Sequence, residues 1–306
     1  MVDSGSGLGA LTEVVRTRVA QLLGPRAARD LEVLQTSAAG AVVRVRTHGT
    51  AEGAVLKVAP RPGAADGRDV DFRRTAAVIG LARGAGVPAP RVLSVDTSGG
   101  DEAWQSLLLE HVPGRPWRQV RPELDAGGVD TAQREIAEVL SAIQAITFDG
   151  FGELDGGARP TGVSLLAALT RRADRILLPG DRESFLAALA SREHLFAAAP
   201  GLPVLVHDDL HHANILFDRR GDRCKLSGVI DWDKAWAGPA ESDPARMAFW
   251  DGMTGRGFWE VYRRAASVPA GWQERDRLLQ LLWCLEYDDG SARHAHDTAR
   301  AWDRLT

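Results

Sequence analysis

Three polar side chains stand between two short apolar runs. In residues 204–217, VLVHDDLHHANILF, His207, Asp209 and Asn214 follow the pattern H-x-D-x-x-x-x-N. Transfer of a phosphoryl group to a hydroxyl needs a carboxylate that orients the hydroxyl and accepts its proton, with an oxygen ligand for magnesium close by. Asp209 is the candidate for the first role and Asn214 for the second. The runs VLV and ILF would hold both ends of this loop in short strands.

Two further residues fit the same chemistry. Asp231 directly follows an apolar run in GVIDWD, seventeen residues after Asn214. Magnesium prefers oxygen ligands and usually takes one or two carboxylates together with phosphate oxygens, so Asp231 is a second candidate ligand. Lys57 lies inside the apolar run AVLKVA, where an ammonium is costly unless it reaches a partner. The oxygens of a nucleoside triphosphate, ATP or GTP, are the natural partner.

The elements that must position these residues change in type along the chain. Helical spacing of apolar residues predicts helices over the ranges 11–23, 70–85, 131–147, 163–178, 183–198 and 274–287. The runs AVVRVRT and AVLKVA read as a hairpin, and RVLSVD and WQSLLLEHV as further strands. We expect an α+β fold with a β-rich lobe over residues 1–111 and a mainly helical lobe over residues 112–306, divided at the Pro-Gly punctuation after Val112.

These residues together resemble the protein-kinase-like superfamily and, within it, the aminoglycoside phosphotransferase family. The family pattern of a histidine, any residue, Asp-Leu, three residues and Asn is matched by His207, Asp209, Leu210 and Asn214. The resemblance covers residues 31 to 290 in the family's order. It implies a two-lobed kinase fold, and it implies that Asp209 is the catalytic base while Asn214 and Asp231 hold Mg²⁺.

The resemblance also implies a nucleotide site. Lys57 would contact the α and β phosphates, and backbone groups of Glu110, His111 and Val112 in LLLEHV would meet adenine. The turn TSAAGAVVRV would cover the phosphates, with backbone N–H groups of the segment from Ser37 to Gly40 as donors. Asp243 matches the acidic residue that braces the catalytic loop in this superfamily.

The sequence departs from the family at three places. Kinases pair the strand lysine with a helix glutamate, and the corresponding position here is Thr75, so Asp71 or Asp69 would have to substitute. The phosphate-covering turn has a single glycine. Asp208 replaces the small residue common between the histidine and the aspartate. For Asp233 two roles remain open, a second metal neighbour or a surface acid.

Composition excludes several function classes. A formal net charge of −4 gives no broad basic surface, so we expect neither nucleic acid nor a membrane as partner. The two cysteines, Cys224 and Cys284, stand in no metal-ligand spacing and suggest no disulfide framework. No leader peptide or membrane span is evident, so we expect a cytoplasmic protein. The oligomeric state is not fixed by the sequence.

The acceptor is expected to be a cationic antibiotic, an aminoglycoside or basic peptide, whose phosphorylation confers resistance. Seven of the nine tryptophans lie from Trp232 onward; most should be core, and some are candidates for the acceptor pocket. Acids available to a cation in this region are Asp251, Glu260, Glu286, Asp288 and Asp289.

Other functions stay open at this point. The alternatives for a kinase are a macrolide or an amino alcohol metabolite as acceptor. A non-catalytic nucleotide-binding relative is a third possibility because the helix glutamate is missing. His207, Asp208, Asp209, His211 and His212 would alternatively form the metal cluster of a phosphohydrolase. We favour a structural role for His207, orienting the loop, and a loop or substrate-wall role for the other two histidines.

Overall fold

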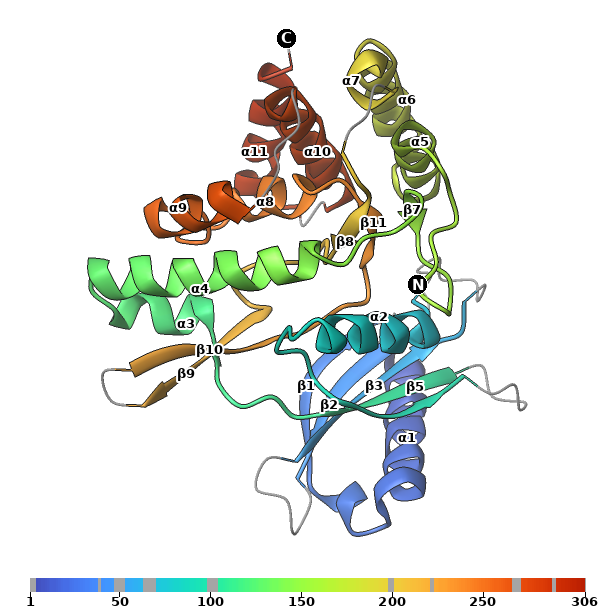
Figure 1. Cartoon of the computed structure of the whole chain (residues 1–306). Coiled ribbons are helices and arrows are strands. Elements are labelled where there is room, and N and C mark those ends of the chain that lie inside the picture. Colours follow the sequence, from blue (N-terminus) through green and yellow to red (C-terminus); the bar gives the residue numbers. More distant parts are fainter. Residues whose placement is uncertain are drawn as a thin grey trace.

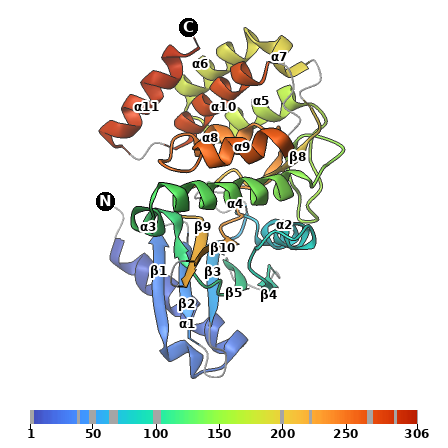
Figure 2. The same ribbon diagram turned by 60° about the vertical axis from the view of Figure 1, so that its left-hand side comes forward.

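The computed structural model describes residues 4–37, 40–46, 53–62, 70–97, 104–197, 201–220, 223–265, 271–287 and 290–305. A five-stranded antiparallel sheet forms one end of the molecule, and most helices lie at the other end (Figures 1 and 2). The strand order is β1-β2-β3-β5-β4, and the bounds are β1 (Leu31–Ser37), β2 (Gly40–Val45), β3 (Ala54–Pro60), β4 (Val92–Asp96) and β5 (Trp104–Glu110). The predicted strands are all present, and the α+β class is confirmed.

Two helices cover opposite faces of this sheet. Helix α1 (Ser4–Leu23) packs apolar side chains against Leu56 and Val58 of β3, while α2 (Phe72–Gly84) belongs to the core on the other face. Successive side chains of a strand point to opposite faces. Lys57 therefore points away from α1, toward the helical part of the chain.

The helical part is built around α4, which lies between the sheet and helices α8 to α11 in both views. Its predicted apolar stripe is buried through Ile136, Leu140 and Ile143. The helices are α3 (Trp117–Val120), α4 (Ala126–Gln144), α5 (Leu165–Ile176), α6 (Pro179–Ala190), α7 (Glu193–Ala197), α8 (Ser242–Met247), α9 (Arg256–Ala265), α10 (Trp272–Glu286) and α11 (Ala292–Asp303), with short 3₁₀ turns at Ala27–Arg29 and Arg121–Glu123.

One helix predicted as continuous is divided. The range 183–198 contains the end of α6 and all of α7, which are separated at Ser191. The Ser191 hydroxyl donates to the Ala188 carbonyl at 2.9 Å and the Arg192 N–H to the Leu189 carbonyl at 3.1 Å, so the last turn of α6 tightens and ends. The prediction of a single helix is wrong here.

Short strands carry the candidate site. They are β6 (Arg115–Pro116), β7 (Gly152–Glu153), β8 (Val204–Val206), β9 (Ile215–Arg220), β10 (Arg223–Val229) and β11 (Trp236–Gly238), arranged as β10-β9-β6 and β7-β11-β8. The loop with Asp209 joins β8 to β9, as predicted, and the loop with Asp231 joins β10 to β11. The chain therefore presents both loops from the ends of paired strands.

The last strand of the large sheet ends at Glu110, and the division into residues 1–111 and 112–306 stays a prediction. Cys224 and Cys284 are both free thiols. Within the described ranges, no helix combines the length and the apolar character that crossing a membrane requires.

Gly40 begins β2 with φ +134°, and a Cβ added there would lie 2.1 Å from the Val58 carbonyl oxygen of β3. We expect Gly40→Ala to lower the free energy of unfolding by about 1–3 kcal/mol, because both the dihedral and the contact become strained. Gly24 has φ +89°, but no atom lies within 4 Å of a Cβ added there. Gly24→Ala should therefore lower the free energy of unfolding by less than Gly40→Ala does. Urea denaturation measures both; equal losses would contradict the close approach of β2 to β3.

Candidate active site

The loop between β8 and β9 is braced by buried hydrogen bonds. Asp243, fully buried on α8, accepts the backbone N–H groups of His207 at 3.0 Å and Asp208 at 2.9 Å. The His207 ring bonds Ile230 O through Nε2 at 3.0 Å and accepts the Asp209 N–H on Nδ1 at 3.2 Å. These contacts assign a neutral ring with its proton on Nε2. The bracing role predicted for Asp243 and the orienting role predicted for His207 are both present.

Burial dominates the charge states of this brace. It lowers the pKa of His207 to about 4, so the ring stays neutral at physiological pH. It raises the pKa of Asp243 to about 7, although two backbone N–H bonds favour the charged form.

Asp209 is held from two sides. Arg246 Nη2 donates to its Oδ1 at 2.5 Å, and Asn214 Nδ2 donates to its Oδ2 at 3.3 Å and to its carbonyl oxygen at 2.9 Å. An ionised carboxylate offers about four acceptor positions, so these contacts fix its orientation and leave room for a hydroxyl. Because Asn214 uses its amide nitrogen here, its side-chain oxygen is the atom suited to a metal.

Lys57 lies between two aspartates of the loop that joins β10 to β11. Its Nζ is 2.7 Å from Asp231 Oδ1 and also donates to Asp233 Oδ2. Asp233 accepts a second hydrogen bond, from the Thr75 hydroxyl at 3.0 Å. Of the two roles left open for Asp233, a surface acid is therefore wrong, since only 17% of its side chain is exposed and it pairs with the strand lysine.

The acids proposed as substitutes for the helix glutamate do not fill that place. Asp71 caps the start of α2, where its carboxylate accepts the backbone N–H groups of Arg73 at 2.8 Å and Arg74 at 3.3 Å. The interpretation of Asp71 as the partner of Lys57 is wrong. Asp69 lies outside the described residues.

Burial alone would lower the pKa of Lys57, but attraction to Asp233 and Asp231 outweighs it and raises the pKa above its usual value. Lys57 in turn lowers the pKa of Asp231 to about 2. Burial raises the pKa of Asp233, against the pull of the lysine. The ammonium and the Asp231 carboxylate are therefore both charged at neutral pH.

The four residues singled out for chemistry converge. The Ile230 N–H donates to the Asn214 carbonyl at 2.9 Å, which joins the loop of Asp231 to the loop of Asp209 and Asn214. Lys57 reaches Asp231 across 174 positions of sequence. Hydrogen bonds therefore link the strand that carries Lys57 to the loop of Asp231, and that loop to the loop of Asp209 and Asn214.

Comparisons with known proteins identify the family. The model of the phosphotransferase enzyme family matches residues 31–278 of the chain. The chain belongs to this family. The predicted enzyme class, a phosphotransferase with an alcohol group as acceptor, is thereby confirmed. No curated protein matches the chain.

Solved structures of similar fold include kinases of small molecules. Aminoglycoside phosphotransferase APH(4)-Ia is 20% identical, with a TM-score of 0.66 and coverage of 96% of both chains. APH(2″)-IIa in its complex with streptomycin and ATP is 16% identical, with a TM-score of 0.59 and coverage of 99% of this chain and 97% of that chain. Plasmodium vivax ethanolamine kinase is 13% identical, with a TM-score of 0.59 and coverage of 100% and 89%. The predicted protein-kinase-like fold is confirmed.

In this phosphotransferase the predicted adenine segment runs beside β10. The Glu110 N–H donates to Arg91 O at 2.8 Å, and the His111 N–H donates to Gly53 O at 3.3 Å. A Cβ on Gly228 would lie 2.4 Å from Val112 Cγ1, so the glycine lets the segment approach the strand that leads to Asp231. Contact of Glu110, His111 and Val112 with adenine stays a prediction.

The predicted phosphate turn is described only at its ends. Ser37 closes β1 and pairs with Gly40 at the start of β2, whereas residues 38 and 39 lie outside the described residues. Gly40 is explained by the close approach of β2 to β3. Phosphate binding by Ser37 and Gly40 stays a prediction.

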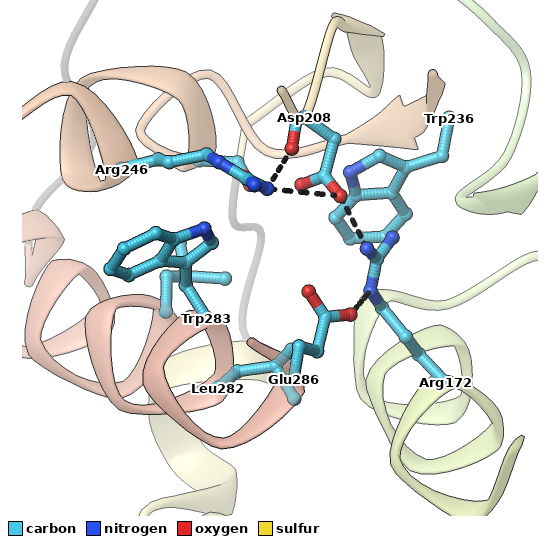
Figure 3. Close-up of a pocket in the computed structure, with 9 residues that line it drawn as sticks. Arg172, Asp208, Trp236, Arg246, Leu282, Trp283 and Glu286 are labelled. Carbon is cyan, nitrogen blue, oxygen red and sulfur yellow. Dashed lines mark hydrogen bonds and ion pairs between the residues drawn. The ribbon is translucent and has the colours of Figure 1, made fainter. Parts of the chain in front are cut away.

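The departure at Asp208 has a structural counterpart. Asp208 has φ +62°, a conformation that glycine adopts more easily, and two arginines hold it there. Arg172 pairs with the Asp208 carboxylate and with Glu286 at 2.7 Å, and Arg246 donates to the Asp208 carbonyl (Figure 3). Neither Arg172 nor Arg246 was singled out in the sequence, because a buried arginine cannot be told from a surface one without knowing its partner.

Two indoles complete this cluster. The Arg172 guanidinium lies 5.1 Å from the ring centroid of Trp236, and that of Arg246 lies 5.2 Å from Trp283. The four side chains line a cavity of about 10 Å³, which has room for a single water molecule. Figure 3 shows them pointing toward one another. As predicted for most tryptophans, Trp236 and Trp283 are buried.

His211 and His212 pack on the aromatic ring of Trp250, with centroids 5.3 and 4.4 Å away. Burial lowers the pKa of both rings, that of His212 to about 4, and His211 Nε2 lies 3.9 Å from Asp209 Oδ1. Among the described residues, no group of three or more His, Cys, Asp or Glu side chains is placed to hold a metal. The geometry favours the substrate-wall role over the phosphohydrolase cluster.

Two of the five acids expected to be available to a cationic acceptor are engaged in ion pairs. Glu286 pairs with Arg172, and Glu260 pairs with Arg134 at 2.6 Å on the surface. Asp251 is exposed, and its charge acts on His212. Asp288 and Asp289 lie outside the described residues.

We expect His207→Gln to change how stability depends on pH. The folded state keeps His207 neutral down to about pH 4, whereas the unfolded chain takes up the proton near 6.5. As pH falls through this window, His207 should lower the free energy of unfolding of the wild type by up to about 3 kcal/mol. The variant should not show this decrease. Asp243, whose raised pKa acts in the opposite direction, is present in both proteins. Urea denaturation at several pH values measures the difference, and parallel profiles would contradict a buried neutral ring.

Proposed function

We propose that the chain transfers the terminal phosphoryl group of ATP or GTP to a hydroxyl of a cationic small molecule, an aminoglycoside or basic peptide antibiotic, and so confers resistance. The observation that supports this most strongly is the convergence of Lys57, Asp209, Asn214 and Asp231, residues of the right types for phosphoryl transfer. Membership of the phosphotransferase family supports the reaction type.

The donor set fits a magnesium–nucleotide complex. Asn214 and Asp231 would hold Mg²⁺, because both offer the hard oxygen ligands that this ion prefers. Magnesium bound there would offset negative charge on the phosphates. The nearby acids Asp209, Asp231 and Asp233 outnumber Lys57 and Arg246, so the site favours an additional cation.

Residues of the chain would have separate roles in binding the nucleotide and in orienting the acceptor. Lys57 would contact the phosphates, Ser37 and Gly40 would cover them, and Glu110 to Val112 would hold adenine. Asp209 would orient the acceptor hydroxyl and take its proton, with its carboxylate held at the required angle by Arg246 and Asn214. No large movement of the loop is needed, because the brace on Asp243 is already formed.

The acceptor wall favours a cation. His211, His212 and Trp250 form an aromatic surface beside Asp209, and the Lys234 ammonium already lies 5.0 Å from the exposed ring of Tyr287. Aromatic faces of this kind attract ammonium groups. An APH(4)-Ia mutant of similar fold, with a TM-score of 0.65, forms a ternary complex with ADP and hygromycin B, which supports an antibiotic as acceptor.

An amino alcohol or a macrolide is the second candidate acceptor. The ethanolamine kinase matches the fold with the same TM-score, 0.59, as the streptomycin complex, so fold alone does not separate the two acceptor classes. An amino alcohol would place one ammonium on the same aromatic wall. A macrolide would rely on its apolar surface.

Asp209→Asn should lower turnover by about 10²- to 10⁴-fold, because an amide cannot accept the hydroxyl proton. Affinity for magnesium–ATP should stay within about twofold, since Asp209 orients the acceptor and does not anchor the nucleotide. Coupled ADP release and isothermal titration calorimetry measure the two effects. Asp149→Asn, which removes an exposed carboxylate outside the site, is the control and should match wild type. Retained turnover in Asp209→Asn would refute the role.

A mixed panel of aminoglycosides, basic peptide antibiotics, macrolides and amino alcohols, incubated with enzyme, ATP and Mg²⁺, should show one acceptor gaining the mass of one phosphate. We expect a multiply charged antibiotic to gain it, because several ammonium groups use the wall and the local acids together. Mass spectrometry reads the result. Phosphorylation of ethanolamine or choline alone, or of a macrolide alone, would overturn the proposed acceptor class.

A further inference from the structure

Helix α2 carries Thr75 where the family resemblance leads one to expect an acid, and Lys57 has an acid from another element beside it. We propose that Asp233 is the residue that positions Lys57 toward the nucleotide phosphates, and that Thr75 holds Asp233 in place. This inference rests on the proposed function, because it assumes that Lys57 serves a bound nucleotide. Asp233 and Thr75 would be positioning residues, since neither needs to touch the reacting atoms.

Both the side chain and the backbone carbonyl of Asp233 make contacts that fit this role. Its Oδ2 accepts from Lys57, and its Oδ1 accepts from the Thr75 hydroxyl at 3.0 Å. Its backbone carbonyl accepts from Arg74 Nη2 at 2.9 Å. Thr75 is 2% exposed, so its hydroxyl bond to Asp233 is shielded from water. Helix α2 therefore reaches the strand lysine through Asp233, as a glutamate on the helix would reach it directly.

The two aspartates beside Lys57 would have different roles once magnesium and nucleotide bind. A metal ion bound at Asp231 would draw that carboxylate away from Lys57, and Asp233 would remain as the partner of the buried ammonium. Without Asp233, the acid in contact with Lys57 among the described residues would be Asp231 alone. The lysine would then compete with the metal for Asp231. Asp233 should therefore matter most when magnesium and nucleotide bind together.

Asp233→Ala is expected to weaken binding of magnesium–ATP by about 10- to 100-fold, the range found when the partner of a binding-site group is removed. The Mg²⁺ concentration for half-maximal nucleotide binding should rise as well, because Lys57 retains Asp231. Isothermal titration calorimetry over a series of Mg²⁺ concentrations measures both, without relying on activity. Unchanged affinity and unchanged Mg²⁺ dependence would overturn the proposal.

Moving the acid to the helix provides a rescue. In the double variant Thr75→Glu with Asp233→Ala, the longer side chain on α2 can enter the space that Asp233 leaves and reach Lys57. We expect the double variant to recover at least tenfold of the lost affinity. A folded double variant, by circular dichroism, that binds no better than Asp233→Ala would overturn the positioning role. If the double variant does not fold, Thr75→Val decides: affinity should fall about three- to tenfold from loss of one hydrogen bond, and no fall would overturn the role of Thr75.

The matched control removes the same charge from the same region. Asp71→Asn keeps a good helix cap, since asparagine caps about as well as aspartate, and should bind magnesium–ATP like wild type. If Asp71→Asn loses as much affinity for magnesium–ATP as Asp233→Ala, the effect arises from the net charge of the region, and the proposal is overturned. The proposed function and the role of Asp233 can be refuted separately. Wild-type protein that binds no magnesium–nucleotide refutes the proposed function, whereas tight binding by both wild type and Asp233→Ala refutes only the role of Asp233.

Discussion

The ion pair of Lys57 is the interaction on which the rest of the site depends. An ammonium on an apolar strand must meet acids, because only 13% of the Lys57 side chain is exposed to the water that would otherwise compensate its charge. Those acids, Asp231 and Asp233, come from a loop of the helical part of the chain. The pair therefore fixes the sheet against the loop that precedes β11, and Arg74 of α2, which donates to the Asp233 carbonyl at 2.9 Å, holds α2 to the same loop. The position of the candidate nucleotide site follows from satisfying one buried charge.

The loop that carries Asp209 is braced by a different kind of contact, hydrogen bonds to its backbone N–H groups. A buried carboxylate, Asp243, accepts two backbone N–H groups of the loop, and the neutral ring of His207 links that loop to Ile230. Backbone groups are present whatever the side chains of the loop are, so this brace fixes the path of the chain on which Asp209 is placed. His211 and His212 take no part in these bonds and pack instead on Trp250.

The sequence was informative where a local pattern has one physical meaning. Alternation around Lys57 and the apolar runs that flank His207 and Asp231 predicted the strands and the loops correctly, because the period of two and the buried flanks leave few other structures. It did not assign Asp233, since an acid two residues after Asp231 can face either the cleft or solvent until the turn geometry is known. The break at Ser191 was missed for a similar reason: the apolar spacing continues across it, and only the hydrogen bonds of the last turn end the helix. A single sequence does not show which distant side chains contact each other.

Asp208 shows how such a partnership makes an unfavourable residue acceptable. At φ +62° an aspartate is strained relative to glycine, and its carboxylate is buried beside Asp243. Arg172 pairs with the carboxylate and Arg246 donates to the backbone carbonyl, and each guanidinium lies over a buried indole, so the cluster is held by packing as well as by charge. Because Arg172 belongs to α5 and Arg246 to α8, and Glu286 of α10 pairs with Arg172, three helices are tied to the residue that precedes Asp209 (Figure 3). A substitution at 208 toward the smaller family residue would therefore relax the backbone but leave two buried guanidinium groups with fewer acids, and the departure at this one position is stable only together with the arginines at the other two.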